Sequence, residues 1–199
     1  MTARSFLLGL TGSIGMGKST TAMFFQEAGV PVWDADAAVH RLYGPGGAAV
    51  AAIAALCPEA IRDDAVDRDV LKRWIASDPC ALSRIEAAVH PLVAQDRAAF
   101  VARHSDAPLV VLDIPLLFET GATGGMDAVL VVSAPPEVQR ARVLARPGMT
   151  AAQFETIHAR QMPDTEKRAR ADYVIETQSL EQTRAEVQAL VQKLGATHA

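Results

Sequence analysis

The chain of 199 residues lacks long apolar runs, cysteine motifs and long basic stretches. No apolar run reaches the roughly 20 residues that a bilayer-spanning helix needs, so we expect no membrane-spanning segment. Residues 1–4 lead directly into an apolar stretch and leave no room for a signal peptide, which predicts a cytoplasmic protein. The two cysteines, Cys57 and Cys80, have neither metal-binding nor redox spacing and are expected to be ordinary reduced thiols.

The charge and the composition exclude further classes of protein and of binding partner. The net charge is −4 at pH 7 and no long basic run is present, which argues against nucleic acid as a main partner. Aromatic residues make up only 5% of the chain, and apart from a bias toward alanine we find no low-complexity segment and no internal repeat. Half of the residues are hydrophobic, enough for a substantial core in one domain of ordinary size. The sequence does not indicate an oligomeric state.

What the sequence does contain is a loop of the form G-x-x-x-x-G-K-[ST], made of Gly12, Ser13, Ile14, Gly15, Met16, Gly17, Lys18 and Ser19. Residues 5–10 before it predict a buried strand, and residues 20–27 after it predict a helix, which is the context in which this motif binds phosphate. Backbone N–H groups and the helix N-terminus form an anion site there, which the glycines let the backbone enclose closely. We therefore expect the loop, with Thr20, to bind a nucleoside triphosphate. Lys18 is expected on the β- and γ-phosphates, and the Ser19 hydroxyl on Mg²⁺.

Apolar runs alternate with amphipathic stretches along the rest of the chain. Strands are expected at residues 5–10, 30–34, 109–113, 128–132 and 173–175, and helices at residues 20–27, 36–42, 136–145 and 180–194. Such alternation predicts an α/β fold with a five-stranded parallel sheet of the P-loop NTPase type, covered by helices on both faces. Ligands of these sheets lie at the carboxyl ends of the strands. Three segments are expected at these strand ends, in one crevice: the glycine loop, residues 34–36 and residues 113–119.

We expect a single domain over residues 1–199, with two additions to its nucleotide-binding core. Helical spacing with breaks near Pro58, Pro79 and Pro91 predicts a helical, substrate-binding insertion over residues 36–104. A polar, arginine-bearing segment over residues 147–170 is predicted to be a small helical lid, whose closure would keep water from the γ-phosphate. The core comprises residues 5–35, 107–146 and 171–199.

Further motifs separate a small-molecule kinase from other proteins with this loop. The N-K-x-D and D-x-x-G motifs typical of GTPases are absent, whereas Asp34-Ala35-Asp36 follows a predicted strand. Together with the insertion and the arginine-bearing segment, this arrangement is expected of a small-molecule kinase. Asp36 and the missing switch motifs disfavour a nucleotide-dependent switch or an inactive binding module. A nucleoside monophosphate kinase stays open, because the insertion contains arginines that suit a phosphate acceptor, namely Arg41, Arg62, Arg68, Arg73, Arg84 and Arg97.

Motifs along nearly the whole chain resemble those of the dephospho-CoA kinase family. Those that carry the resemblance are residues 9–19, the D-A-D segment at 32–36, Ile85-Glu86 with His90-Pro91, the P-L-L-F-E signature within 113–119, Gln139 with Arg142 and Arg146, Arg160-Gln161-Met162, and residues 167–175. The P-L-L-F-E signature is the most discriminating of them. The resemblance implies ATP-dependent phosphorylation of the ribose 3′-hydroxyl of dephospho-CoA to give coenzyme A and ADP, the last step of coenzyme A biosynthesis.

The resemblance also implies roles for two acidic residues. Asp36 is the expected catalytic base, which orients the acceptor hydroxyl and takes its proton. Its alternative role is to cap the following helix, although Asp34 is equally placed to do so. Asp113 ends a hydrophobic strand as a Walker-B carboxylate does. It is expected either to contact Mg²⁺ through water or to be a solvated acid at a strand end.

Three arginines and a group of acceptor-site residues complete the expected site. Arg142 and Arg146 lie four residues apart on one helix face, close enough to contact the same phosphate group. Such a pair is usually a solvated face, and it is the resemblance that implies contact with the γ-phosphate. Arg142 is thus expected to act in catalysis with Lys18, and Arg160 to reach back from the lid. His90, next to Pro91, is either an ordinary histidine at a helix end or, as the resemblance implies, part of the acceptor site. The other residues expected at the acceptor are Leu116, Leu117, Phe118 and Glu119.

The sequence departs from the family pattern at three places. Pro147 follows Arg146 where the family has aspartate, which changes the edge of the lid. Glu176-Thr177 replaces a segment in which the family often has an asparagine near the adenine, and it offers no such amide contacts. Met16 stands where the loop normally has glycine or serine, so its side chain must point away from the phosphate cradle.

Overall fold

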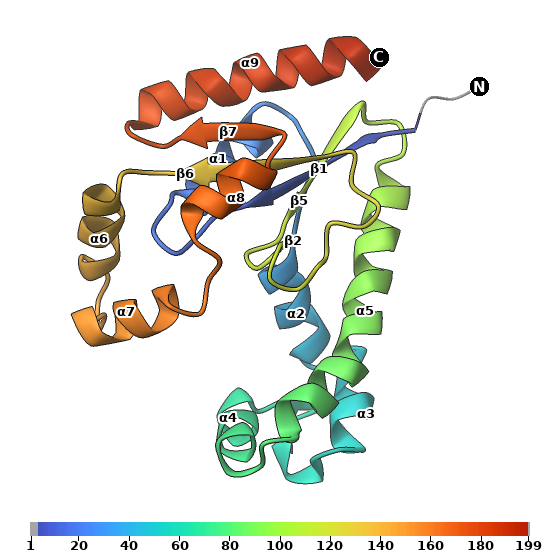
Figure 1. Cartoon of the computed structure of the whole chain (residues 1–199). Coiled ribbons are helices and arrows are strands. Elements are labelled where there is room, and N and C mark those ends of the chain that lie inside the picture. Colours follow the sequence, from blue (N-terminus) through green and yellow to red (C-terminus); the bar gives the residue numbers. More distant parts are fainter. Residues whose placement is uncertain (1–3, 199) are drawn as a thin grey trace. The chain divides into compact units, whose positions relative to one another are not determined.

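The computed structural model describes residues 4–198 of the chain. The chain divides into two compact units, one made of Met1–Trp33 with His104–Ala199 and the other of Asp34–Arg103. We call the first the sheet unit and the second the helical unit (Figure 1).

Among the described residues, five strands form the main sheet, in the order β2-β5-β1-β6-β7. These strands are β1 (Phe6–Thr11), β2 (Val32–Asp34), β5 (Leu109–Asp113), β6 (Ala128–Ser133) and β7 (Tyr173–Glu176). The central strand β1 pairs in parallel with β5 and β6, and β6 pairs in parallel with β7. All five strands expected from the sequence are confirmed, with ends that shift by at most two residues.

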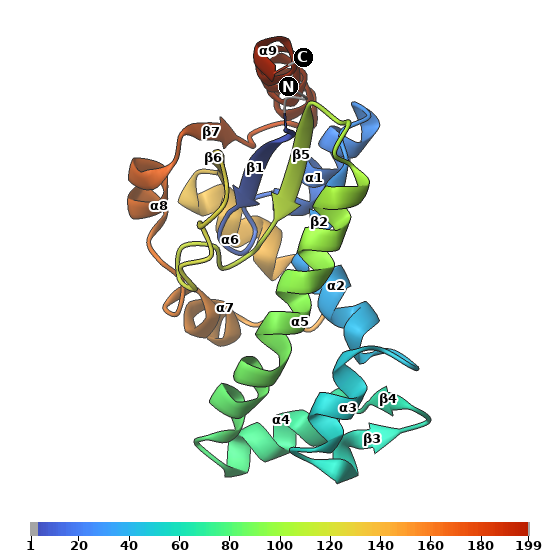
Figure 2. The ribbon, with the colours of Figure 1, turned by 90° about the vertical axis from the view of Figure 1, so that its right-hand side faces the viewer.

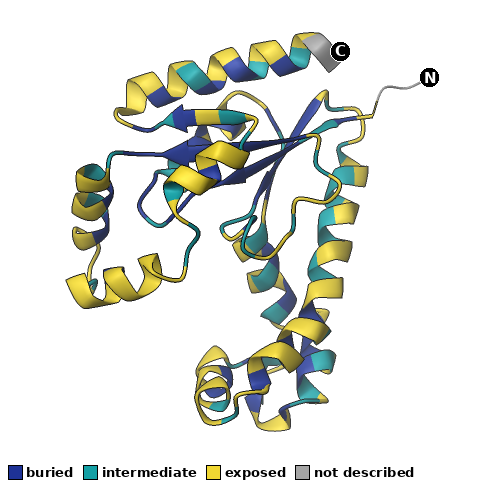
Figure 3. Ribbon diagram, in the orientation of Figure 1, coloured by how far each residue is buried: buried dark blue, intermediate teal, exposed yellow. Residues whose placement is uncertain are grey.

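The two faces of the sheet bury different side chains, as the alternation along a strand requires. On β6, Leu130 and Val132 belong to the main hydrophobic cluster, whereas Val129 and Val131 pack with Leu117 on the opposite side. Strands β5 and β6 are therefore buried along their whole length, and β1 is buried from Leu8 to Thr11 (Figure 3). This two-sided burial explains why they read as unbroken apolar runs in the sequence.

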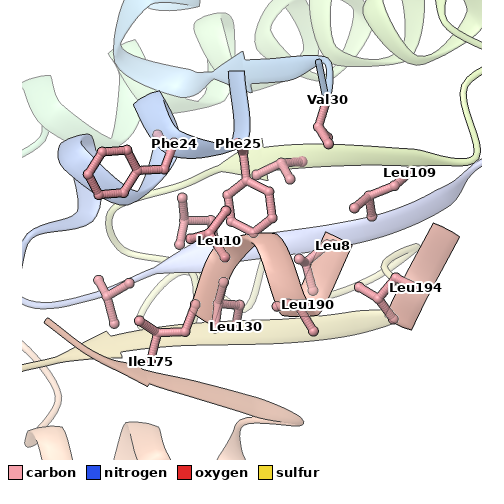
Figure 4. Packing of buried hydrophobic residues seen from close by; sticks show 14 of the residues in the cluster. Leu8, Leu10, Phe24, Phe25, Val30, Leu109, Leu130, Ile175, Leu190 and Leu194 are labelled. Carbon is pink, nitrogen blue, oxygen red and sulfur yellow. The ribbon is translucent and has the colours of Figure 1, made fainter. Parts of the chain in front are cut away.

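Helices α1 (Lys18–Glu27) and α9 (Leu180–His198) pack against each other over the main cluster. Figure 4 shows Phe24 and Phe25 of α1 and Leu190 of α9 against the apolar side chains of the sheet. Burial of such side chains contributes roughly 1.5–3 kcal/mol each. The packing thus fixes α1, and with it the loop that precedes α1, on the sheet.

Three further helices of the sheet unit follow β6. They are α6 (Pro136–Leu144), α7 (Ala151–His158) and α8 (Asp164–Arg170). Helix α6 begins with Pro136 at its first position, where a missing N–H costs nothing, and it ends before Pro147. Helix α7 begins with a capping box in which Thr150 and Gln153 satisfy each other's backbone N–H groups. Residues 147–170 are therefore largely helical, as the sequence predicts.

The helical unit contains α2 (Ala35–Tyr43), α3 (Ala49–Ala54), a 3₁₀ turn (Pro58–Ala60), α4 (Arg68–Ser77) and α5 (Ala81–Arg103). Its hydrophobic cluster draws on each of these elements, with Leu42, Ile53, Val70, Ile85 and Val89 buried. The helical unit therefore has a core of its own.

The expected helix break at Pro91 is wrong. Helix α5 continues through Pro91 for 23 residues in all. Pro91 is exposed, while Val89 in the turn before it is buried in the core of the unit. Packing on both sides of the proline offsets the one backbone hydrogen bond that its ring removes.

A short hairpin in the helical unit was not expected from the sequence. Strands β3 (Ile61–Arg62) and β4 (Ala65–Val66) pair antiparallel around Asp63 and Asp64 (Figure 2). Both aspartates have positive φ, 49° and 57°, as the two central residues of the tight turn favoured in hairpins must have. Aspartate tolerates this conformation better than most residues, but it is a weaker signal than glycine.

Asp34 caps α2 in the structure, because its side chain accepts a hydrogen bond from the Ala37 N–H at 2.9 Å. We expect Asp34→Ala to lower the free energy of unfolding by about 1 kcal/mol, the usual effect of losing such a cap. Asp34→Asn keeps an acceptor and serves as the control, with a change of less than half that size expected. Urea denaturation of the three proteins measures this difference, and equal losses in both variants would exclude the capping explanation.

Candidate active site

The loop between β1 and α1 depends on glycine at two positions. Gly15 and Gly17 have φ values of 79° and 86°, a region that other residues rarely adopt. A Cβ on Gly15 would lie 2.5 Å from the Val143 Cγ2, and one on Gly17 would lie 2.9 Å from the Thr177 Oγ1. The glycines thus allow α6 and the segment after β7 to pack directly against the loop.

The N-terminus of α1 has the properties of an anion site. Gly17 is its N-cap residue and provides no side-chain hydrogen bond to the first turn. The N–H groups there point along the helix axis toward the loop, and the helix dipole adds positive potential. Lys18 and Ser19, the first two residues of α1, bring an ammonium and a hydroxyl group to the same place. This donor set fits the phosphates of a nucleoside triphosphate.

Lys18 and Asp113 form an ion pair beside the loop, with 2.6 Å between the Lys18 Nζ and the Asp113 Oδ1. Asp113 is only 2% exposed, so the expectation of a solvated strand-end acid is wrong. It is buried because β5 lies next to β1, with Asp113 opposite Leu10 in the register. A buried carboxylate therefore lies where the phosphates are expected.

Met16 packs beneath the loop. Its side chain is buried in the main cluster, and its sulfur accepts a hydrogen bond from the Ala134 N–H at 3.0 Å. The expectation that this side chain points away from the phosphate cradle is confirmed. Methionine suits such a site because its long flexible side chain fills irregular gaps.

Thr177 has a role that the sequence did not predict. Its hydroxyl donates to the Met16 carbonyl at 2.9 Å and accepts from the Arg142 Nη1 at 2.9 Å, and its N–H donates to the Ser133 carbonyl at 2.8 Å. Buried Thr177 thus ties Arg142 to the last turn of the loop. Arg146, four residues further on, is exposed. The signal in the sequence was the departure from the family pattern at this position.

Glu119 has two partners from the segment around α8. Its Oε1 lies 2.9 Å from the Nζ of Lys167, which is fully buried, and accepts a hydrogen bond from the Met162 N–H at 2.9 Å. Burial alone would raise the pKa of the Glu119 carboxyl, but Lys167 and the Met162 N–H outweigh it and lower this pKa. Glu119 thus joins the loop after β5 to α8.

The other residues expected at the acceptor from this segment differ in exposure. Leu116 is exposed, Phe118 is partly buried, and Leu117 is fully buried against Val129 and Val131. Leu117 therefore belongs to the hydrophobic core. Arg160, in the turn just after α7, is exposed.

Three of the expected residues belong to the helical unit. Asp36 lies in the first turn of α2, and His90 and Pro91 lie on α5; all three are exposed. Asp34, not Asp36, caps α2, so the alternative capping role of Asp36 is wrong. The Asp36 carboxylate thus needs no part in holding its own helix.

Within residues 4–198, no group of three or more His, Cys, Asp or Glu side chains is placed to hold a metal ion. The Ser19 hydroxyl and the Asp113 carboxylate are the oxygen donors near the loop that the sequence predicts for Mg²⁺. They fit this ion, because Mg²⁺ keeps several waters and is commonly bound by one or two protein groups together with nucleotide phosphates.

Comparison with known proteins agrees with this geometry. The family model for dephospho-CoA kinase matches residues 6–182. A dephospho-CoA kinase from Cereibacter sphaeroides is 65% identical over 194 residues, which cover 98% of each chain. The chain belongs to the dephospho-CoA kinase family. Among solved structures, a Thermus thermophilus protein is 39% identical with a TM-score of 0.83, covering 96% of this chain and 98% of its own.

The fold is shared more widely than the sequence. A dephospho-CoA kinase from Campylobacter jejuni is 20% identical, and its structure matches with a TM-score of 0.67 over 96% of this chain and 97% of its own. The expected family, enzyme class and P-loop fold are therefore confirmed, and a nucleoside monophosphate kinase is not favoured. In the described part of the chain, no helix has the length and apolar character needed to cross a membrane.

We expect Glu119→Gln to lower the free energy of unfolding by about 3 kcal/mol at pH 7, because buried Lys167 loses its counter-charge. The pKa of Glu119 is lowered by folding. Its carboxylate therefore stabilises the wild type fully above the unfolded-state pKa of about 4.3 and loses this effect as the pH falls through the lower folded-state pKa.

Urea denaturation at pH 7 and below about pH 4 measures this contribution. The difference in the free energy of unfolding between wild type and Glu119→Gln is expected to become smaller in acid. Glu166→Gln, which changes an exposed carboxylate of α8, is the control, with a small effect at both pH values. A difference that does not depend on pH would contradict the ion-pair explanation.

Proposed function

We propose that this chain transfers the γ-phosphoryl group of ATP to the ribose 3′-hydroxyl of dephospho-CoA, giving coenzyme A and ADP. The observation that carries the proposal is the family match over residues 6–182. The glycine loop, with Lys18 and the buried Asp113 beside it, supplies the phosphate site that such a transfer requires.

The charged side chains around the loop would bind and orient the phosphates. Lys18 would leave Asp113 for the β- and γ-phosphates, because a triphosphate offers the ammonium more negative charge than one carboxylate does. Arg142 is tied to the loop through Thr177 and would need little reorganisation to neutralise charge at the nucleotide. We assign Arg146 and the more distant Arg160 to the same task.

Mg²⁺ would be held by the Ser19 hydroxyl and, through water, by Asp113. When bound, the ion neutralises charge on the β- and γ-phosphate oxygens during the transfer. Asp113 is well suited to this role because it is fixed by burial and by its place in the sheet register. When Lys18 moves toward the phosphates, the Asp113 Oδ1 would be able to accept a hydrogen bond from a water molecule.

Asp36 would act as the base at the acceptor. Its carboxylate would accept the proton of the ribose 3′-hydroxyl and orient the oxygen for in-line attack, a contribution mainly of positioning. The capping of α2 by Asp34 supports this role, because Asp36 is then available to a ligand. A phosphate acceptor would need no base, which also favours an alcohol as the acceptor.

The helical unit and the segment around α7 complete the proposal. We assign binding of the acceptor to residues 36–104, with exposed His90 and Pro91, and to the segment with Leu116, Leu117, Phe118 and Glu119. For Leu117 and Glu119 we propose an indirect part, because one is buried in the core and the other is paired with Lys167. Residues 147–170 would act as the lid, with Arg160 at the phosphates.

The test of this proposal is ADP release from Mg-ATP with dephospho-CoA, AMP, CMP or UMP as the acceptor. We expect turnover with dephospho-CoA alone and a product phosphorylated on the ribose 3′-hydroxyl, which phosphorus NMR or mass spectrometry identifies. Turnover with a monophosphate instead would leave the phosphate site in place and refute the proposed acceptor.

Asp36→Asn is expected to fold and bind ATP normally while the rate of transfer falls by about 10²-fold or more, as for loss of a general base. The measurements are kcat with dephospho-CoA and the Kd for ATP. Asp106→Asn, at an exposed aspartate of the sheet unit, is the matched control and should keep the wild-type rate. A turnover of Asp36→Asn close to that of the wild type would refute the assignment of the base.

A further inference from the structure

One residue of the glycine loop, Ile14, is held by side chains from two different helical segments. The Ile14 N–H donates to the Gln161 Oε1 at 3.0 Å, and the Ile14 carbonyl accepts from the Gln139 Nε2 at 2.8 Å. Gln139 lies on α6 and is buried, whereas Gln161 lies in the turn between α7 and α8 and is partly exposed. Both segments therefore reach the same residue of the loop from outside it.

The contact of Gln161 differs in kind from that of Gln139. Gln139 is fixed in the core of the sheet unit and contributes to the permanent shape of the loop. Gln161 belongs to the segment proposed as the lid and uses a neutral amide oxygen to occupy an N–H group of the loop. A single neutral hydrogen bond is weak enough to break and form again during a catalytic cycle.

The backbone next to Gln161 is fastened as well. The Met162 N–H donates to the Glu119 Oε1, which also pairs with the buried Lys167 of α8. Residues 161 and 162 are thus attached to other parts of the sheet unit at two points, the glycine loop and the segment after β5. Gln161 therefore has little freedom to reach another partner while the segment stays in this position.

Arg160 is the residue immediately before this double attachment. Consecutive Cα atoms lie about 3.8 Å apart, so the bond between Gln161 and Ile14 holds the Arg160 backbone close to the loop. The Arg160 N–H also donates to the Ile157 carbonyl at the end of α7. The side chain itself is exposed and is available to a charged ligand at the loop.

We propose that Gln161 is a positioning residue, whose bond to the Ile14 N–H couples the α7–α8 segment to the glycine loop and places Arg160 at the transferring phosphoryl group. The kinetic part of this inference rests on the proposed phosphoryl transfer. Gln161 itself donates no hydrogen bond to the phosphates in this scheme. Its effect on the reaction passes through Arg160.

A double-mutant cycle tests the coupling. Gln161→Met keeps the length of the side chain but removes the acceptor, and we expect kcat to fall about fivefold to tenfold with KM for ATP nearly unchanged. In an Arg160→Met background the same change should lower kcat by less than about twofold, because coupled residues are not additive. Gln192→Met, at an exposed glutamine of α9, is the control.

Hydrogen exchange of the Ile14 amide tests the contact directly, in the protein without ATP or acceptor. We expect protection in the wild type, at least about tenfold faster exchange in Gln161→Met, and restored protection in Gln161→Glu, which keeps an acceptor. This measurement needs no turnover. An enzyme inactive toward dephospho-CoA would therefore refute the proposed function, while Ile14 exchange would still decide on the contact.

Two results would overturn the proposal. Equal Ile14 exchange in wild type and Gln161→Met would mean that the hydrogen bond does not hold the loop. Independent, multiplying effects of Arg160→Met and Gln161→Met on kcat would mean that Gln161 does not act through Arg160. A purely structural role of Gln161 would appear as such multiplying effects together with a lower Tm.

Discussion

The loop of residues 12–17 must turn tightly enough to aim its N–H groups at one place. The side chains packed around the loop stabilise that turn. Two of its glycines adopt positive φ, which lets neighbouring segments approach the backbone itself. Met16 fills the space beneath the loop. Thr177 packs closely against Gly17, which is possible only because Gly17 has no Cβ. The phosphate site is thus held from below and from the sides, because a short loop alone has too few internal bonds to fix its own shape.

Charge is arranged around the same loop. Lys18 is paired with a carboxylate that the sheet register buries at the end of β5, and a second pair joins partly buried Glu119 to buried Lys167. Buried ions are costly unless they are paired. Each pair therefore specifies where its segment must lie, the first for the start of α1 and the second for α8. In this way the ion pairs add a directional constraint to the positions that hydrophobic packing already gives these elements.

The strands and the glycine loop were predictable from the sequence because each depends on a local pattern. A strand buried on both faces, such as β5, is an unbroken apolar run, and the loop motif has fixed spacing. The contacts of Thr177, Gln139 and Gln161 with the loop were not predictable, because they join residues more than 100 positions apart. The passage of α5 through Pro91 and the hairpin at Asp63 and Asp64 depend on packing in the helical unit, which overrides local preference.

The sulfur atom under the loop also bears on resistance to oxidants. Methionine oxidation converts an apolar thioether into a polar sulfoxide, and its rate depends on access to the sulfur. The Met16 side chain is enclosed in the core and its sulfur is hydrogen-bonded to Ala134. Met23, in the helix α1 that follows, is 43% exposed. An oxidant would therefore modify α1 on its outer surface well before it damaged the base of the loop.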